Sequence, residues 1–333
     1  MIPTEFVSRI AILGSGAWGT ALALVAADAG HDVLMWARED LVVREINQHH
    51  ANPYLANVTL PDRITATTSM DACADCPVIV VAIPTQFIRP TLGPNIDILN
   101  GAILVDVSKG IEQGTHLRVS EILDDLGAKP SAYVVLSGPS HAEEVGRRIP
   151  TTVVAASSDA RAADLVQDIF NTDVFRVYTS GDVVGVEICG AMKNVIAIAA
   201  GMIDGLGMGD NTKAALVTRG LAEIARFGCA MGAEKATFYG LAGLGDLVVT
   251  CDSKHSRNRF VGEQLGRGRA LEEVLGNMSA VAEGVPTTKA VMEIASERAI
   301  ELPISTKVYQ IMFEGLDPRT ALYELMTRPV RCE

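Results

Sequence analysis

The chain has 333 residues, of which 48% are hydrophobic and 20% are charged, and its formal net charge at pH 7 is −12. This length predicts two domains with a sizeable core, and the composition excludes a largely disordered chain. The acidic balance argues against a general affinity for nucleic acid or for an anionic membrane. An anionic substrate would therefore need a local cluster of Lys, Arg and backbone N–H groups.

The N-terminal segment lacks the basic start and apolar centre of a signal peptide, and six cysteines in a chain of this length do not form a disulfide framework. We therefore expect a cytoplasmic protein. The most apolar stretch, 183–202, is interrupted by Glu187 and Lys193, which favours a buried helix over a membrane span. Cys73 and Cys76 have C-x-x-C spacing but lack a second pair, so we expect no metal site there, and their role stays open.

A glycine-rich turn follows the first apolar run of the chain. The run 10–13 leads into Gly14-Ser15-Gly16-Ala17-Trp18-Gly19 and then into an alanine-rich stretch. In a strand, turn and helix of this kind, the first glycine permits the turn, the second lets the backbone approach a pyrophosphate, and the third lets the helix pack on the strand. The N-terminus of the helix adds free N–H groups and its dipole. We expect nucleotide binding at these glycines; a purely structural turn is the alternative.

Further short runs rich in Val and Ile are bounded by Gly, Pro or Ser. They cover 33–36, 78–83, 103–107, 133–136 and 151–156. Because these runs are continuous rather than alternating, they are typical of buried parallel strands. Helical stretches lie between some of them, at 117–126 and 160–170. The pattern predicts an α/β fold whose N-terminal domain, 1–180, is a doubly wound, Rossmann-like, mostly parallel sheet.

After residue 180 the strand-like runs nearly vanish. Long helical stretches take over, including 183–203, 212–231 and 286–298. We expect a mainly α-helical C-terminal domain over 181–333. Its three glycine-rich patches, 201–209, 240–245 and 262–268, are too irregular for a repeat, and we expect them to form loops at a cleft between the domains.

The choice of dinucleotide is usually made about 20 residues past the glycines, at the end of the second strand. Arg38 stands there and would pair with a 2′-phosphate, which favours NADP(H). Glu39 and Asp40 follow at once and keep NAD(H) open as the donor. A surface charge cluster is the structural alternative.

Lys193 lies in one of the least polar helical stretches of the chain. Positions three and four residues away carry no acid, so we expect a buried lysine without a local partner. Such burial lowers the pKa of an amine towards the range of a general base. A lysine that reaches out to solvent is the alternative. Asn194, beside it, would fix a hydroxyl or amide of a ligand.

Two loops follow expected strands at the carboxyl edge of the sheet, where open α/β folds bind ligands. Lys109 ends the run 105–109, and the segment Ser137-Gly138-Pro139-Ser140-His141-Ala142 follows a later strand. This placement is general to the fold and not specific to a reaction. His141 is a weaker candidate for a catalytic base.

A basic cluster, Lys254-His255-Ser256-Arg257-Asn258-Arg259, precedes a helical stretch. Ser256 and Asn258 are candidate helix caps, Arg257 would bind a phosphate through two N–H groups, and the helix N-terminus adds its dipole. We expect an oxyanion site here; a solvated basic loop is the alternative. Asp246, upstream in a glycine-rich segment, would orient a basic group nearby.

Taken together, these residues resemble the bacterial-type NAD(P)-dependent glycerol-3-phosphate dehydrogenases from Ile10 to about Leu325. The segments that carry the resemblance are 14–23, 107–111, 137–142, 190–205, 240–250, 256–259 and 281–284. The resemblance implies hydride transfer from nicotinamide to the ketone carbon of dihydroxyacetone phosphate, with Lys193 as the proton donor, or as the acceptor in reverse. It also implies a homodimer and a product, sn-glycerol 3-phosphate, used for glycerophospholipid synthesis.

Residue by residue, the resemblance implies two sets of contacts. Substrate contacts would come from Lys109, Gly138, Ser140, Lys193, Asp246, Ser256, Arg257 and Asn258. Cofactor contacts would come from Gly14, Gly16, Ala17, Trp18, Gly19, Arg38, Lys109, Ala142, Arg257, Val281 and Glu283. The family commonly has Ser where this chain has Ala17, so only the backbone N–H serves at that position.

Two other classes remain as alternatives. One is another two-domain dehydrogenase, acting on a β-hydroxy acid or a hydroxyacyl thioester; the cluster 256–259 favours a small phosphate ester over these substrates. The other is a non-catalytic dinucleotide sensor, against which a partnerless Lys193 argues. The sequence does not fix the oligomeric state or any feedback regulation.

Overall fold

The computed structural model describes residues 9–278 and 281–329, and the chain forms two compact units. The first unit contains residues 9–108 and 118–187, and the second contains 109–117 and 188 onward. The chain therefore passes between the units after residues 108, 117 and 187. The expectation that the chain has no signal peptide concerns residues 1–8, which lie outside the described residues.

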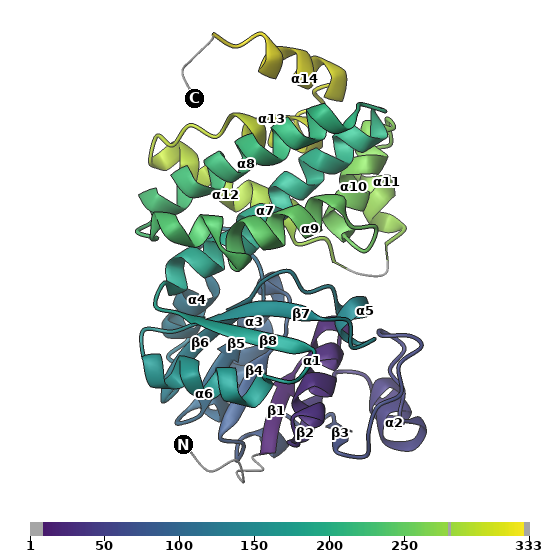
Figure 1. Ribbon diagram of the computed structural model, residues 1–333, viewed down its shortest axis with the longest axis vertical. Helices are drawn as coiled ribbons and strands as arrows, with labels where there is room; N and C mark the ends of the chain where they lie inside the picture. The colour runs from purple at the N-terminus through teal and green to yellow at the C-terminus, as the bar shows by residue number, and fades with distance from the viewer. Residues whose placement is uncertain (1–8, 279–280, 330–333) are drawn as a thin grey trace. The chain divides into compact units, whose positions relative to one another are not determined.

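The first unit is built on an eight-stranded sheet with the order β3-β2-β1-β4-β5-β6-β7-β8 (Figure 1). The strands are β1 (Arg9–Leu13), β2 (Asp32–Trp36), β3 (Ile64–Thr67), β4 (Val78–Val81), β5 (Ile103–Asp106), β6 (Ala132–Ser137), β7 (Thr151–Ala156) and β8 (Phe175–Ser180). Neighbouring strands pair in parallel except β6 and β7, which are antiparallel. The expected Rossmann-like, mostly parallel sheet is confirmed.

Two strands, β3 and β8, were not expected from the sequence. Both lie at the ends of the strand order, and their side chains alternate between buried and exposed. Only one face of such an edge strand is covered, so its sequence lacks the continuous apolar run that marks the central strands. The central β4, in contrast, is the fully buried run Val-Ile-Val-Val.

Helices pack against this sheet. They are α1 (Ala17–Asp28), α2 (Asp40–His49), α3 (Thr85–Leu92), α4 (Val119–Asp125), α5 (Ala142–Val145) and α6 (Ala160–Phe170). Helix α1 is nearly all buried and consists largely of small residues, so it lies close to the sheet. The core of the unit joins its alanines to the Val and Ile side chains of the strands.

The described residues of the second unit form helices joined by loops and contain no strand. It contains α7 (Val183–Gly205, which begins in the first unit), α8 (Asp210–Ala230), α9 (Asp246–Asp252), α10 (Arg257–Gly266), α11 (Leu271–Gly276), α12 (Gly284–Glu297), α13 (Pro303–Phe313) and α14 (Pro318–Met326). A mainly α-helical C-terminal region is thus confirmed. Among the described helices, α7 is long and apolar enough to span a membrane, but 89% of its most apolar stretch is buried within the protein.

Two of the glycine-rich patches form a helix contact rather than loops. A Cβ on Gly201 of α7 would lie 1.9 Å from the carbonyl oxygen of Arg259, and one on Gly262 of α10 would lie 1.9 Å from that of Ile198. Gly205 and Gly266 make similar approaches. The expectation of loops was wrong here because glycines spaced four residues apart on two helices allow their backbones to touch. The contact fixes the start of α10 relative to α7.

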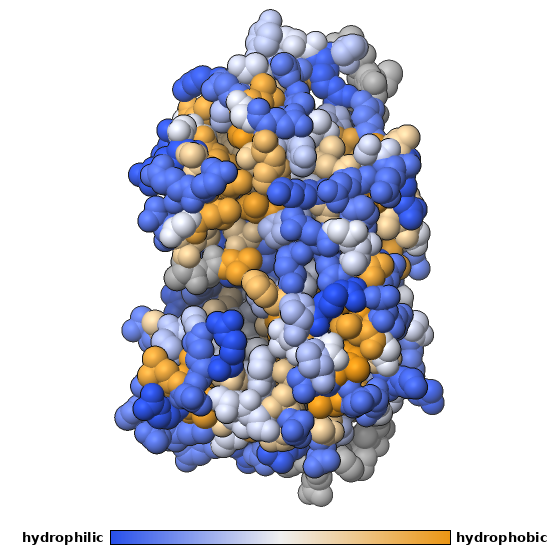
Figure 2. Space-filling view, turned by 180° about the vertical axis from the view of Figure 1, so that it is seen from behind, coloured by the Kyte–Doolittle hydropathy of each residue, from blue (hydrophilic) through white to orange (hydrophobic). Residues whose placement is uncertain are grey.

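The surface combines charged side chains with scattered apolar ones. Figure 2 shows apolar side chains gathered in separate patches among polar ones on the face that it presents. Tyr323 and Met326, both on α14, are among the most exposed large apolar residues, at 68% and 76%.

Candidate functional site

The glycine turn lies at the carboxyl end of β1 and leads directly into α1. Gly14 has a φ of +122°, and a Cβ there would lie 2.5 Å from the carbonyl oxygen of Ala82, so the position requires glycine. A Cβ on Gly19 would lie 2.1 Å from the Gly14 carbonyl oxygen, which explains the third glycine. Gly16 is exposed, faces open space and caps α1 without a side-chain hydrogen bond. The first turn of α1 therefore presents backbone N–H groups that fit a pyrophosphate.

Ala17 and Trp18 form that first turn. The indole Nε1 of Trp18 is buried and has no hydrogen-bond partner among the described residues. A buried donor of this kind costs free energy unless a ligand accepts from it, which agrees with a group bound at this turn. Ala17 supplies only its backbone N–H.

Arg38 follows β2, the neighbour of β1 in the sheet, and so lies at the same edge as the glycine turn. Its side chain is 83% exposed and pairs with Glu39 at 3.2 Å. The Tyr54 hydroxyl donates to the other Glu39 oxygen at 2.8 Å. The hydrogen bond from Tyr54, followed by that from Arg38, lowers the pKa of Glu39. Arg38 and an ionised Glu39 thus stand side by side.

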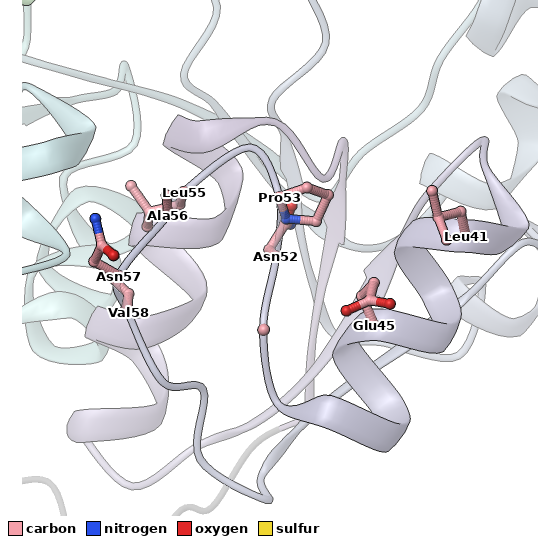
Figure 3. Close-up of a pocket in the computed structure, with 9 residues that line it drawn as sticks. Leu41, Glu45, Asn52, Pro53, Leu55, Ala56, Asn57 and Val58 are labelled. Atoms are coloured by element: carbon pink, nitrogen blue, oxygen red, sulfur yellow. The ribbon is translucent and has the colours of Figure 1, made fainter.

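One residue that supports the turn was missed by the sequence analysis. The amide nitrogen of Asn52 donates to the Ser15 carbonyl at 3.0 Å and to the Thr20 hydroxyl at 2.8 Å. Asn52 also lines a hollow of about 320 Å³ beside α2, together with residues such as Leu41 and Glu45 (Figure 3). No expected site residue lines this hollow. Asn52 gave no signal in the sequence because it lies 37 residues from Ser15.

The loop after β6 holds four further candidates of the first unit. Gly138 has a φ of +151°, and a Cβ there would lie 2.9 Å from the Cα of Val153, so a larger residue would be strained. The Ser140 hydroxyl donates to the Gly138 carbonyl at 2.9 Å. His141 caps the short α5, which Ala142 begins. The backbone of this loop is therefore held in a defined conformation at the carboxyl edge of the sheet.

A buried charged cluster centres on Asp246 in the second unit. The Lys193 Nζ donates to Asp246 Oδ1 at 2.5 Å and to the Thr250 hydroxyl at 2.8 Å. The Lys109 Nζ donates to the other carboxylate oxygen of Asp246 at 2.8 Å. Lys193 is 7% exposed and Asp246 is 1% exposed. One carboxylate thus holds two ammonium groups at a fixed separation.

Burial and charge act against each other in this cluster. Burial lowers the pKa of Lys193 to about 8, Asp246 partly opposes this effect, and Lys109 adds to it. Burial alone would raise the pKa of Asp246, but the two lysines outweigh it, so this carboxylate stays ionised. Lys193 therefore exchanges its proton near neutral pH, as a general acid or base requires.

The structure corrects the expectation that Lys193 has no partner. The acid lies 53 residues away in sequence, beyond the reach of the local spacing rule. Asp246 begins α9, directly after the glycine-rich π-helical segment Leu241–Gly245, and Thr250 lies one helical turn further along. Asp246 does orient a basic group, but this group is the lysine pair rather than the cluster 254–259.

The basic cluster 254–259 forms the start of α10. Ser256 caps the helix and accepts from the Arg259 backbone N–H at 3.2 Å, as expected. Asn258 does not cap: its side-chain oxygen accepts from the Gly284 N–H at 2.9 Å. Ser256 occupies the N-cap position of α10. Asn258 instead links α10 to the start of α12.

Only part of the positive charge in this cluster is available to a ligand. Arg259 pairs with Asp204 at 2.7 Å and with Glu263 at 3.6 Å, so its charge is compensated within the unit. Arg257 is exposed and makes no ion pair among the described residues. Arg257 is therefore the arginine of this cluster that is open to an anion.

Gly284 brings the remaining candidates of the second unit together. A Cβ on Gly284 would lie 2.8 Å from both the Asn194 carbonyl oxygen and the Asn258 side-chain oxygen. Val281 and Glu283 immediately precede it, and Glu283 caps α12. The Asn194 side chain also donates to the Lys109 carbonyl at 3.5 Å. Segments from four parts of the sequence therefore meet around α7.

Comparison with known proteins identifies the family. The model for the N-terminus of NAD-dependent glycerol-3-phosphate dehydrogenase matches residues 9–163, and the model for its C-terminus matches residues 182–323. The chain belongs to the NAD-dependent glycerol-3-phosphate dehydrogenase family. It is 52% identical to the glycerol-3-phosphate dehydrogenase [NAD(P)+] of Geobacillus kaustophilus over 97% of this chain and 95% of that protein. It is 51% identical to the protein of the same name from Prosthecochloris aestuarii over 97% and 99%, respectively.

Solved glycerol-3-phosphate dehydrogenases share the fold. The Coxiella burnetii enzyme is 37% identical and superposes with a TM-score of 0.91 over 98% of this chain and all of that one. The enzyme from Saccharomyces cerevisiae is 29% identical, with a TM-score of 0.79 over 94% of this chain and 98% of that one. A ketopantoate reductase from Ralstonia eutropha, at 14% identity and a TM-score of 0.58, shares the fold alone.

Proposed function

We propose that the protein interconverts dihydroxyacetone phosphate and sn-glycerol 3-phosphate by hydride transfer with NADP(H), NAD(H) being the alternative donor. The observation that carries this proposal is the buried Lys193, whose pKa of about 8 suits proton exchange with an alkoxide at neutral pH. Membership of the glycerol-3-phosphate dehydrogenase family, matched over both units, supports the substrate.

Lys193 acts as the catalytic acid in ketone reduction. When bound, the nicotinamide supplies the hydride. As negative charge develops on the ketone oxygen, the ammonium of Lys193 donates a proton to it; in the oxidation of glycerol 3-phosphate, the neutral amine accepts the proton. Asp246 holds Lys193 through a 2.5 Å contact and Lys109 through a 2.8 Å contact, which fixes the donor and a second positive charge.

Arg257 anchors the substrate phosphate at the start of α10. Its guanidinium is exposed and uncompensated among the described residues, and the helix N-terminus adds its dipole. Lys109, Gly138, Ser140, Asp246, Ser256 and Asn258 complete the proposed substrate contacts. Binding of the phosphate orients a reactant of only three carbons. Such positioning lowers the activation free energy by roughly several kcal/mol.

The dinucleotide binds with its pyrophosphate at the glycine turn. Its proposed contacts are Gly14, Gly16, Ala17, Trp18, Gly19, Arg38, Lys109, Ala142, Arg257, Val281 and Glu283. The open Gly16 and the unsatisfied Trp18 indole support the turn as the pyrophosphate seat. Arg38 favours a 2′-phosphate, while the ionised Glu39 beside it keeps NAD(H) as an alternative. Calorimetric titration with NADPH and with NADH decides between them.

The remaining proposals concern organisation. Residues 1–180 supply most of the dinucleotide-binding domain, and 181–333 supply most of the helical substrate-binding and catalytic domain; residues 109–117 belong with the second unit and 181–187 with the first. The protein acts in the cytoplasm as a homodimer, and its product supplies glycerophospholipid synthesis.

One spectrophotometric assay tests the reaction. NADPH is mixed with the protein and with dihydroxyacetone phosphate, with a 3-oxo acid, or with no substrate, and absorbance at 340 nm is followed. The proposal predicts loss of absorbance with dihydroxyacetone phosphate alone. Faster loss with the 3-oxo acid would favour a β-hydroxy acid dehydrogenase, and no loss with any substrate, either with NADPH or with NADH in its place, would favour a non-catalytic sensor.

A further inference from the structure

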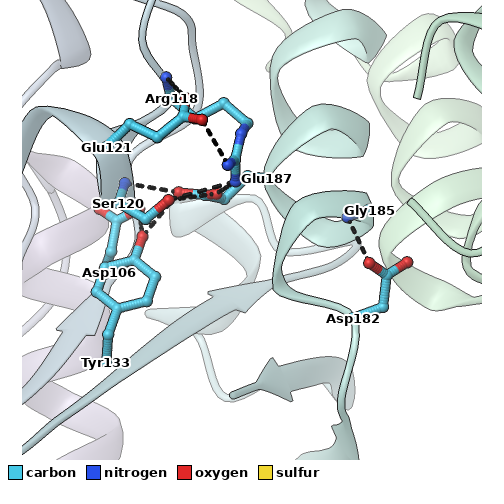
Figure 4. A network of polar contacts seen from close by, with 8 residues as sticks. All are labelled: Asp106, Arg118, Ser120, Glu121, Tyr133, Asp182, Gly185 and Glu187. Atoms are coloured by element: carbon cyan, nitrogen blue, oxygen red, sulfur yellow. Dashed lines mark hydrogen bonds and ion pairs between the residues drawn. The ribbon is translucent and has the colours of Figure 1, made fainter. Parts of the chain in front are cut away.

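A buried polar network in the first unit has no place in the proposed reaction. Figure 4 shows Glu187 of α7 surrounded by side chains from α4 and β6. Glu187 Oε1 accepts from the Ser120 N–H at 2.8 Å and from the Tyr133 hydroxyl at 2.9 Å. Its Oε2 accepts from the Ser120 hydroxyl at 2.9 Å and from the Arg118 guanidinium. Every acceptor position of this buried carboxylate is therefore used.

The network continues to Asp106 at the end of β5. The Tyr133 hydroxyl lies 3.1 Å from Asp106 Oδ2, and Asp106 Oδ1 accepts from the Ser108 N–H at 2.9 Å. Asp106 is fully buried. Tyr133 therefore joins two buried carboxyl groups, Asp106 and Glu187.

Hydrogen-bond counting places one proton on Asp106. Tyr133 has a single hydroxyl hydrogen, so it cannot donate to both carboxyl groups at once. Burial raises the pKa of Glu187, but Arg118 and the two donors of Ser120 oppose this effect and favour the ionised form, whereas Asp106 faces no cation in the network. The consistent arrangement runs from the Asp106 O–H to Tyr133 Oη and from the Tyr133 O–H to Glu187. Burial, opposed by the Ser108 N–H, also raises the pKa of Asp106 to about 8.

The network lies where the chain leaves the first unit. Asp106 is two residues before the passage after 108, Arg118 is the first residue after the return at 117, and Glu187 is the last residue before the passage after 187. Each of the three connections between the units therefore begins or ends at, or within two residues of, a member of this hydrogen-bond network. The first connection reaches Lys109 three residues after Asp106, and the third reaches Lys193 six residues after Glu187 in the same helix.

We propose that protonated Asp106, bridged by Tyr133 to Glu187, positions the two segments that present Lys109 and Lys193 to Asp246. The inference rests on the function proposed above and makes Asp106 and Glu187 positioning residues, which touch neither substrate nor cofactor. When Asp106 loses its proton, two carboxylates face one hydroxyl, and one of the two hydrogen bonds is lost. The Ser108–Lys109 turn or the first turns of α7 then lose their fixed geometry.

The test uses Asp106→Asn as a permanently uncharged mimic. Its amide N–H₂ donates to Tyr133, and its oxygen still accepts from Ser108. The measured quantity is the ratio of kcat/KM for dihydroxyacetone phosphate in the variant to that in the wild type, from pH 6.5 to 9.5. The titration of Lys193 affects both proteins and cancels in this ratio. We expect a constant ratio below the pKa of Asp106 and a rise of up to about tenfold per pH unit above it.

Asp182→Asn is the matched control. Asp182 accepts from the Gly185 N–H at 2.8 Å at the start of the same helix, and Figure 4 shows it apart from the Asp106–Tyr133–Glu187 chain. Its ratio to wild type is expected to be independent of pH. A flat ratio for Asp106→Asn, or the same rise for Asp182→Asn, would overturn the proposal.

Two further measurements keep the proposal testable if activity is poor. Tyr133→Phe removes the bridge, so its kcat/KM is expected to be lower than that of the wild type at neutral pH. This difference is expected to shrink at higher pH, where the wild type loses the Asp106 proton. A difference that does not change with pH contradicts the proposal. The second measurement needs no substrate and compares the melting temperatures of Asp106→Asn and the wild type as a function of pH. The melting temperature of the variant relative to that of the wild type is expected to rise from about pH 4 to about pH 8 and then to level off. The reason is that a carboxyl pKa raised by folding makes the wild type less stable as the pH rises through this range. A wild type that does not reduce dihydroxyacetone phosphate refutes the proposed function instead, and leaves this stability test in force.

Discussion

Replacing Asp246 by Asn is expected to move the pH limit of ketone reduction to lower pH. In the wild type, Lys193 has a pKa of about 8, because burial lowers it and the Asp246 carboxylate partly restores it. The substitution keeps the shape and one of the two acceptor oxygens, but it removes the negative charge and replaces the other oxygen with an N–H₂ donor. Lys109, which contacts the same group at 2.8 Å, remains and repels the Lys193 ammonium without compensation.

The contact distance sets the size of the effect. An opposite charge at hydrogen-bond range changes a pKa by about 1 to 3 pH units. The pKa of Lys193 is therefore expected to be lower by that amount in the variant. Lys193 is half protonated at pH 8 in the wild type, so a pKa lower by 1 to 3 units reduces the protonated fraction, and with it reduction at pH 8, by about 5- to 500-fold. Part of the activity returns as the pH is lowered.

The assay is the pH profile of kcat/KM for dihydroxyacetone phosphate with saturating NADPH. Asp252→Asn is the control, because Asp252 lies on the same helix, is 82% exposed, and pairs with Lys213 outside the cluster. Its profile is expected to match that of the wild type. An Asp246→Asn enzyme that binds NADPH normally and keeps its limit near pH 8 would refute the assigned role of the carboxylate.

Three further predictions follow from the second unit. Lys193→Ala is expected to abolish turnover while calorimetry finds NADPH affinity nearly unchanged; a variant that keeps most of its kcat would exclude the assigned role. Arg257→Ala is expected to raise KM for dihydroxyacetone phosphate by about 10- to 100-fold, since a hydrogen bond to a charged group contributes about 1.5 to 3 kcal/mol; an unchanged KM places the phosphate elsewhere. Gly262→Ala is expected to lower the free energy of unfolding by about 1 to 3 kcal/mol or more, because its Cβ would lie 1.9 Å from a carbonyl oxygen of α7. Gly276→Ala, which meets open space, serves as its control in the same denaturant titration.

The central strands were predictable because they are buried on both faces, and helices such as α6 were predictable because their buried residues recur at helical spacing. Continuous apolar runs marked β4 and β5, and α6 was predicted with its observed bounds. The edge strands β3 and β8 carry alternating side chains and escaped the same criterion. The sequence therefore predicts the middle of the sheet better than its edges.

Contacts between distant segments were the least predictable part of the site. A charged residue in an apolar helix marked Lys193 correctly as buried, and the same signal was present at Glu187. Neither signal names a partner, because Asp246 and Tyr133 lie more than 50 residues away in sequence. Glycines in helices were misread for a related reason: only the neighbouring helix shows why a Cβ is excluded.

Transfer of a labelled hydride is a direct test of the proposed reaction. Dihydroxyacetone phosphate is reduced with NADPH that carries deuterium at the transferring position of the nicotinamide, and the product is examined by NMR. We expect sn-glycerol 3-phosphate with deuterium bound to carbon 2, and loss of this product in Lys193→Ala. Unlabelled product, or no glycerol 3-phosphate from the wild type, would contradict the proposed reaction.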